Sequence, residues 1–281
     1  ISHGYVRTAK SYILYRAERT RVRDMNTRLM RTFEDITYSD AKESDIKREN
    51  ANIDGNTPMG AMLKYGSEGA KHFNEMYVLN PKHSEAHRNG DIHIHDLDFY
   101  TLTTTCCQID ILKLFKDGFS TGHGVLREPN DISSYSALAC IAIQSNQNDQ
   151  HGGQSIVNFD YGLAPGVKKT YKKRYFRLLK NSLELLDNKL VDDDIEDLQN
   201  TLKKEGFEPA LDENPEYDVR ERELLIEKGF DEKEVEKVQE FTKRKAAAET
   251  DKATYQAMEA FIHNLNTMHS RAGAQTPFSS I

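Results

Sequence analysis

The chain has 281 residues, of which 37% are hydrophobic and 30% are charged, and its formal net charge is −7. This length allows one large domain or two ordinary ones, and the acidic balance argues against a protein that binds nucleic acid directly, which would carry a basic surface. The sequence has neither a run of about 18–20 apolar residues that would span a membrane nor the pattern of a signal peptide.

The three cysteines are too few and odd in number for a disulfide framework, so we expect a reducing, cytoplasmic setting. The chain starts without Met, and both of its ends look cut. We therefore interpret it as a piece of a longer chain.

The first third of the chain is predicted to be mainly helical. Residues 1–31 combine an apolar group with a series of arginines, which predicts a helix with a solvated cationic face or, alternatively, one that contacts phosphate. Residues 32–60 contain Asp-Gly and Thr-Pro turn signals and are predicted to form a loop. Residues 61–88 are predicted to be helical with a break at "LNPKH", and Asn89-Gly90 should end the second helix.

Two strands are predicted next. The segment "DIHIHDLDF" alternates apolar and polar residues, which places His93 and His95 on one face of a strand. The threonine-rich segment "TTTCCQIDILKLF" predicts a second strand, and the glycines of "KDGFSTGHG" predict turns.

The remainder is predicted to be mostly helical. Asp131 or Ser133 should cap a helix that loosens in an Asn/Gln-rich segment and ends at Gly152-Gly153. A Pro-Gly stop follows at 165–166, and long helices should occupy about 168–271, interrupted by an exposed loop at 205–218. In the last helix one apolar stripe is predicted to be buried, made up of Tyr255, Met258, Ile262, Leu265 and Met268.

His93 and His95, with Asp96 beside them, are the first candidate site. Two histidines on one strand face are typical of zinc or binuclear metal sites, which leaves a metal-dependent hydrolase as an alternative function. We favour two histidines hydrogen-bonded to carboxylates without metal, because a metal site needs further ligands and none is marked elsewhere.

The adjacent Cys106 and Cys107 are the second candidate site. Neighbouring residues on a strand point to opposite faces, so only one of the two thiols can face a given pocket. Cys140 lies in an apolar helical run and is predicted to be a core residue.

Two polar segments complete the candidates. "QSNQNDQHGGQ" combines amides and glycines that suit a nucleotide, although a polar loop at a helix end explains it equally well. Near the end of the chain, Ser279 and Ser280 are candidates for phosphate contact, or simply part of a turn and a strand.

Four segments, in this order, resemble those of the anaerobic (class III) ribonucleoside-triphosphate reductases, which are glycyl-radical enzymes. They are "DIHIHDLDFY", "TTTCCQIDILKLFKDGFSTGHG", "QSNQNDQHGGQSI" and "HSRAGAQTPFSSI". The resemblance runs over residues 24–281. The preceding "TAKSYILYRAERTRVRD" resembles the end of an ATP-cone regulatory domain, whose C-terminal tail would be residues 1–23.

The resemblance implies an α/β fold, namely the N-terminal part of a ten-stranded α/β barrel of the pyruvate formate-lyase type, with long helices. It implies reduction of ribonucleoside triphosphates to 2′-deoxyribonucleoside triphosphates for DNA synthesis and repair. A glycyl radical generates a thiyl radical that removes the 3′ hydrogen, and a second cysteine supplies hydrogen at the 2′ position. That second cysteine is Cys106 on the family pattern, with Cys107 as the alternative.

The resemblance also implies roles for the polar candidates. Residues near the substrate would be His93, His95, Asp96, Ser279 and Ser280, without a metal ion. The contacts with a nucleotide effector would involve Gln144, Asn146, Gln147 and His151.

The expected cofactors and partners follow from the same resemblance. They are a glycyl radical outside this chain, formate as reductant, ATP or deoxynucleotide effectors, a radical S-adenosylmethionine activating enzyme and a second copy in a homodimer. Zinc is expected only in a C-terminal region outside this chain. Without the thiyl cysteine and the radical loop, we expect the 281-residue piece to be inactive alone; a non-catalytic nucleotide-binding regulatory module is the third possibility.

Overall fold

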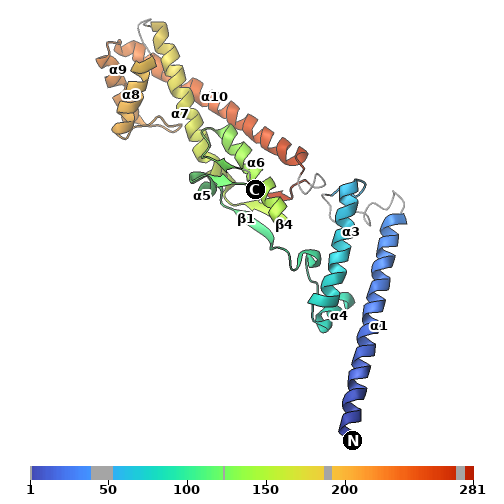
Figure 1. The fold of residues 1–281 in the computed structure, drawn as a ribbon. Helices are drawn as coiled ribbons and strands as arrows, with labels where there is room; N and C mark the ends of the chain where they lie inside the picture. The colour runs from blue at the N-terminus through green and yellow to red at the C-terminus, as the bar shows by residue number, and fades with distance from the viewer. Residues whose placement is uncertain (1, 39–52, 123, 187–191, 270–275) are drawn as a thin grey trace. The chain divides into compact units, whose positions relative to one another are not determined.

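Residues 2–38, 53–122, 124–186, 192–269 and 276–281 are described by the computed structural model (Figure 1). The first of two units consists of Ile1–Cys107, Gln144–Gln154 and Met268–Ser280, and the second consists mainly of Gln108–Ile143 and Ser155–Thr267. The structure is mixed α/β and mostly helical.

The first unit begins with two helices that lie side by side, α1 (Ser2–Tyr38) and α3 (Pro58–Phe73) (Figure 1). The predicted first helix is confirmed, but the loop predicted for 32–60 is wrong at both ends. Helix α1 continues because Ile36 is buried and extends the apolar face. Helix α3 starts early because the Thr57 hydroxyl accepts a hydrogen bond from the Gly60 amide at 3.0 Å and Pro58 takes the first position.

The predicted break in the next helical stretch is confirmed. A π-helical turn, η1 (Asn74–Val78), precedes α4 (Pro81–Asn89). The Asn80 side chain caps α4 by accepting a hydrogen bond from the Lys82 amide at 3.0 Å. Gly90, with φ of 82°, ends α4 in the left-handed conformation, as predicted.

The strand predicted for "DIHIHDLDF" is wrong. The segment is irregular up to Asp96, which has φ of 50°, and continues as a 3-10 turn, η2 (Leu97–Phe99). The segment is bound to helical residues instead of to a neighbouring strand. Asn74 donates to the Leu97 carbonyl at 2.6 Å, and Ser67 donates to the buried Asp98 carboxylate at 2.7 Å.

A three-stranded sheet has the order β1-β4-β5, with β1 (Thr105–Ile109), β4 (His151–Ile156) and β5 (Ser279–Ser280). The predicted cysteine strand is therefore confirmed. It ends at Ile109 because the Asp110 carboxylate caps α5 (Ile111–Lys116) by accepting from the Lys113 amide at 3.1 Å. The predicted turns lie within an antiparallel hairpin of β2 (Phe119–Ser120) and β3 (Val125–Leu126).

The Asn/Gln-rich segment does not loosen, since it forms the last turns of α6 (Ile132–Asp149). The cap by Asp131 is confirmed, because its carboxylate accepts from the Ser134 amide at 2.8 Å. The glycine pair predicted to end this helix lies instead within β4.

The predicted Pro-Gly stop is wrong, because Pro165 and Gly166 lie inside α7 (Phe159–Leu186). Close packing explains the glycines on this helix. A Cβ atom on Gly162 would lie 2.4 Å from the Ile111 side chain, and one on Gly166 would lie 2.8 Å from the ring of Tyr135.

Helices α8 (Asp192–Lys204) and α10 (Glu232–Thr267) lie within the predicted long helices. The exposed loop predicted at 205–218 is wrong at its end, because α9 (Pro215–Glu227) begins there and Tyr217 is buried in the core. Helices α7 and α10 lie side by side in the second unit (Figure 1). The predicted apolar stripe of α10 is not the buried one, because Tyr255, Ile262 and Met268 are exposed. A face rich in small residues is buried instead, which allows close helix packing: Ala246, Thr250, Ala253, Ala257 and Phe261.

A buried carboxyl group lies among the helices of the second unit. Glu221 accepts hydrogen bonds from the hydroxyls of Tyr175 at 2.7 Å and Tyr217 at 2.6 Å, and from the Gln239 amide at 2.8 Å. Burial raises the pKa of Glu221, while these hydrogen bonds act in the opposite direction. None of the helices in the described part of the chain combines the length and apolar content that crossing a bilayer requires.

Candidate active site

The cysteine pair lies where β1 and β4 approach closely. Cys106 is exposed and adopts a left-handed conformation with φ of 62°, which is unfavourable for a residue other than glycine. Gly152 on β4 has φ of 92°, and a Cβ atom there would lie 3.0 Å from both the amide nitrogen and the sulfur of Cys106. Glycine at this position therefore allows the approach of the two strands.

Cys107 is half-buried and bonded to two amide side chains. Asn146 donates from Nδ2 to the Cys107 sulfur at 2.9 Å, and the thiol donates to Oε1 of Gln154 at 3.1 Å. Asn146 Nδ2 also donates to the same Gln154 oxygen. Burial raises the pKa of Cys107, against the lowering effect of the Asn146 hydrogen bond. The group is thus a neutral thiol at neutral pH, positioned by amides of α6 and β4.

Asp96 connects two histidines beside this pair. One carboxylate oxygen lies 2.6 Å from Nδ1 of His95, and the other lies 3.2 Å from Nε2 of His151. His151 is buried and stacks on Phe99, with ring centroids 3.8 Å apart. His151 is adjacent in sequence to Gly152, so this group is connected directly to the strand that contacts Cys106.

His93 and His95 do not share a strand face, although their ring centroids lie 6.0 Å apart. Both side chains are exposed, and His93 also approaches His87, with ring centroids 5.6 Å apart. Within the described ranges, no three His, Cys, Asp or Glu side chains are grouped in a way that would hold a metal ion. The arrangement suits hydrogen bonding to a polar ligand.

The other predicted residues are distributed as follows. The buried Gln147 donates to the Thr276 carbonyl at 3.3 Å, and Gln144 is half-buried. Ser279 and Ser280 form β5, next to β4 in the sheet. Of the predicted nucleotide contacts, Asn146 reaches Cys107, while His151 contacts Asp96 and Phe99.

Sequence reasoning missed Gln154, which lies inside a quoted motif but was not singled out. Its burial follows from its position on β4, where His151, Gln154 and Ile156 are the buried residues. The sequence signal was weak. Gln154 differs in type from the small residues that flank it, but it does not belong to a recognisable catalytic motif.

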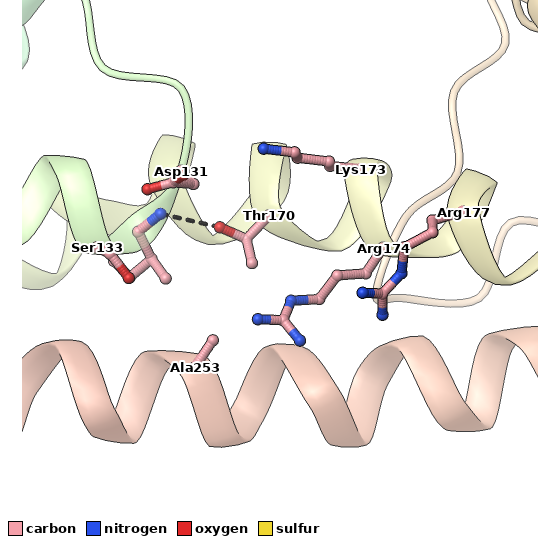
Figure 2. A pocket seen from close by; sticks show the side chains of 8 residues that line it. Asp131, Ser133, Thr170, Lys173, Arg174, Arg177 and Ala253 are labelled. Carbon is pink, nitrogen blue, oxygen red and sulfur yellow. Dashed lines mark hydrogen bonds between the residues drawn. The ribbon is translucent and has the colours of Figure 1, made fainter.

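A second candidate lies within the second unit, in a pocket of about 260 Å³ (Figure 2). Side chains from α7 and α10 enter it together with the start of α6, and its polar lining consists of Asp131, Ser133, Thr170, Lys173, Arg174 and Arg177. The Thr170 hydroxyl accepts a hydrogen bond from the Ile132 amide at 2.8 Å.

The pocket has a positive character that is partly neutralised. Lys173, Arg174 and Arg177 follow one another on α7 at helical spacing. Glu249 pairs with Arg174 at 3.1 Å and also with Arg177. The Asp131 carboxylate already caps α6. Lys173, Arg174 and Arg177 therefore remain as the cationic hydrogen-bond donors in the lining of the pocket.

Comparison with known proteins gives a consistent result. The sequence model of a family described as anaerobic ribonucleoside-triphosphate reductase matches residues 49–281. Curated proteins with this name from Salmonella typhimurium and Escherichia coli are each 31% identical over 176 residues, which is 62% of this chain and 24% of theirs. The protein with this name from Enterobacteria phage T4 is 30% identical over 135 residues, covering 46% of this chain and 22% of its own. The chain spans about a quarter of the length of these curated relatives.

Proposed function

This chain belongs to the anaerobic ribonucleoside-triphosphate reductase family, and from this membership we propose that it forms part of an enzyme that reduces ribonucleoside triphosphates. The resemblance carried by the four sequence segments is thereby confirmed. The alternative of a metal-dependent hydrolase built on His93 and His95 receives no support from these relatives.

We propose that Cys107, rather than Cys106, supplies hydrogen to C2′ of the ribose. The observation that carries this choice is the pair of hydrogen bonds that Cys107 makes with Asn146 and Gln154. A hydrogen-atom donor must be a protonated thiol in a fixed position, and burial keeps this thiol protonated.

The overall reaction is balanced with formate as the reductant. A ribose C–OH, formate and a proton yield a C–H, carbon dioxide and water, so formate loses two electrons and the 2′ carbon gains them. The initiating hydrogen abstraction at C3′ would come from a thiyl radical that the expected glycyl radical generates. Cys107 contributes the hydrogen atom that forms the new C2′–H bond as its own S–H bond breaks.

The polar residues around the thiol would bind the substrate. His95 and His151 both contact the Asp96 carboxylate, so this carboxylate positions the two imidazoles beside the proposed substrate. His93, Ser279 and Ser280 remain proposed substrate contacts. Gln144, Asn146, Gln147 and His151 remain proposed nucleotide contacts, and the bond from Asn146 to Cys107 favours the substrate as their ligand.

We propose that the effector's phosphates bind in the pocket of the second unit. Three cationic side chains, Lys173, Arg174 and Arg177, suit a polyphosphate. Replacing Arg177 by Gln in the full-length enzyme should weaken binding of dATP, dGTP and dTTP about 10-fold or more, which corresponds to one charge-assisted hydrogen bond. Lys180→Gln, one turn further along α7, is the matched control. Equal affinities for Arg177→Gln and Lys180→Gln would refute the assignment.

The wider architecture remains part of the proposal. It comprises a ten-stranded barrel to which residues 24–281 contribute, the tail of an ATP-cone in residues 1–23, a homodimer and activation by a radical S-adenosylmethionine enzyme. Support for these features comes from family membership.

The catalytic proposal is tested in the full-length enzyme under strict anaerobiosis, with activating enzyme, S-adenosylmethionine and formate. We expect Cys107→Ser to abolish deoxynucleotide formation, because an O–H bond is too strong to replace S–H as a hydrogen-atom donor. Cys106→Ser should retain turnover. Loss of turnover in Cys106→Ser with retention in Cys107→Ser would reverse the assignment.

A further inference from the structure

Glu249 brings a carboxylate to the cationic side chains of the pocket in the second unit. It lies on α10, one turn before Ala253, which lines the pocket. Its Oε2 atom lies 3.1 Å from Nη1 of Arg174 and is also paired with Nη2 of Arg177. Figure 2 shows both arginines extending from α7, with the Arg174 guanidinium directed towards α10. A single carboxylate oxygen therefore joins two of the three cations of the pocket.

The spacing of the two arginines explains what this carboxylate does in the protein without a ligand. Arg174 and Arg177 lie three residues apart on α7, and like charges at helical spacing repel each other. The oxygen between them offsets that repulsion. Phosphate oxygens use the same guanidinium donors as a carboxylate does. A phosphate group and Glu249 must therefore compete for these donors.

We propose that Glu249 is the internal competitor of the effector's phosphates and thereby sets the affinity of the pocket. The inference rests on the proposed function, which assigns the phosphates to this pocket. Binding exchanges the ion pairs between α7 and α10 for contacts between phosphate and the arginines. The Glu249 side chain is only half-buried, so it can turn into solvent when it is displaced.

The proposal predicts that removal of a charged residue improves binding, whereas damage to a binding site would weaken it. In the full-length enzyme without its radical, Glu249→Gln should bind dTTP about 10-fold more tightly than the unsubstituted protein, because two partly exposed ion pairs no longer have to be broken. Glu249→Ala should show a similar gain. Inorganic tripolyphosphate should displace dTTP from both variants at a lower concentration, since the gain lies in phosphate binding.

Glu184→Gln is the matched control. It also removes a carboxylate that pairs with a cation of α7, since Glu184 lies 3.6 Å from Lys180, but this pair lies outside the residues that line the pocket. The affinity for dTTP should be unchanged in Glu184→Gln. Affinities are measured by isothermal titration calorimetry, and the pocket is identified as the site that Arg177→Gln weakens. Circular dichroism of each variant checks that the fold is kept.

The outcomes separate this inference from the proposal on which it rests. Tighter binding in both Glu249 variants, with unchanged affinity in Glu184→Gln, supports it. If Arg177→Gln weakens dTTP binding while the Glu249 variants bind dTTP no more tightly, the inference fails alone and the pocket assignment stands. Equal tightening by Glu184→Gln also overturns it, because the effect is then one of overall charge. Equal affinities for Arg177→Gln and Lys180→Gln remove the pocket assignment and the inference together.

Discussion

The close approach of β1 and β4 predicts a specific cost for adding one methyl group at Gly152. Alanine at this position must adopt φ of 92°, and its Cβ atom would lie 3.0 Å from the nitrogen and sulfur of Cys106. The left-handed conformation costs about 1–2 kcal/mol for a non-glycine residue. Overpacking against the backbone of β1 adds about 1–3 kcal/mol. We therefore expect Gly152→Ala to lower the free energy of unfolding by about 2–5 kcal/mol.

Gly90 provides a matched control for the conformational part of this cost. It has φ of 82°, and a Cβ atom there would meet nothing within 4 Å among the described residues. Gly90→Ala should therefore cost only about 1–2 kcal/mol. The assay is urea unfolding of the full-length protein followed by far-UV circular dichroism, with the reactivity of Cys106 towards iodoacetamide as a local probe. Equal destabilisation by the two substitutions would refute the close contact between Gly152 and Cys106.

Two further predictions concern ionisable groups. Burial raises the pKa of Glu221 in the folded state, so its contribution to stability is fully present below about pH 4.5 and is lost as pH rises through the folded-state pKa; thermal unfolding from pH 5 to 8 should show this decline, and Glu221→Gln should flatten it. Among the thiols, Cys106 should react with iodoacetamide fastest and Cys107 more slowly, while Cys140, whose pKa burial raises to about 11, should stay unmodified at pH 8. Rapid labelling of Cys140, located by peptide mass spectrometry, would contradict its place in the core.

Helices were predictable where local signals and tertiary packing agree. Gly90 after α4 has a local role that was read correctly from residue type, whereas Thr57 and Pro58 were read as turn signals although they begin α3. Pro165 and Gly166 carry an equally strong local signal for a helix end, yet α7 passes through them. The contact of Gly166 with Tyr135 shows why, since packing against a residue 31 positions earlier decides the outcome.

The strand predicted at the two histidines failed for a related reason. Period-two alternation requires a neighbouring strand, but Asn74 and Ser67 bind the following residues, Leu97 and Asp98, to helices. The alternation could not reveal these competing hydrogen bonds, because Asn74 and Ser67 lie more than 20 residues away from Leu97 and Asp98 in the sequence.

At the candidate site, the residues could be recognised from their types, but the contacts between them could not be predicted from the sequence. The cysteine pair and the polar segment at 144–151 were recognised from their composition, but nothing local predicted that Asn146 would bond to Cys107. Gln154 and the pocket of the second unit were missed because both depend on segments that meet only in the folded chain. The family resemblance favoured Cys106, whereas the hydrogen bonds favour Cys107 as the proposed donor.

The most direct test of the account follows the hydrogen atom itself. CTP is reduced anaerobically in D₂O by the activated full-length enzyme, and the deoxynucleotide is analysed by NMR for deuterium at C2′. Because a thiol exchanges its hydrogen with solvent, the account predicts deuterium at C2′ in the product of the unsubstituted enzyme and of Cys106→Ser, and no product from Cys107→Ser. Deuterated product from Cys107→Ser would contradict the claim that this thiol delivers the hydrogen.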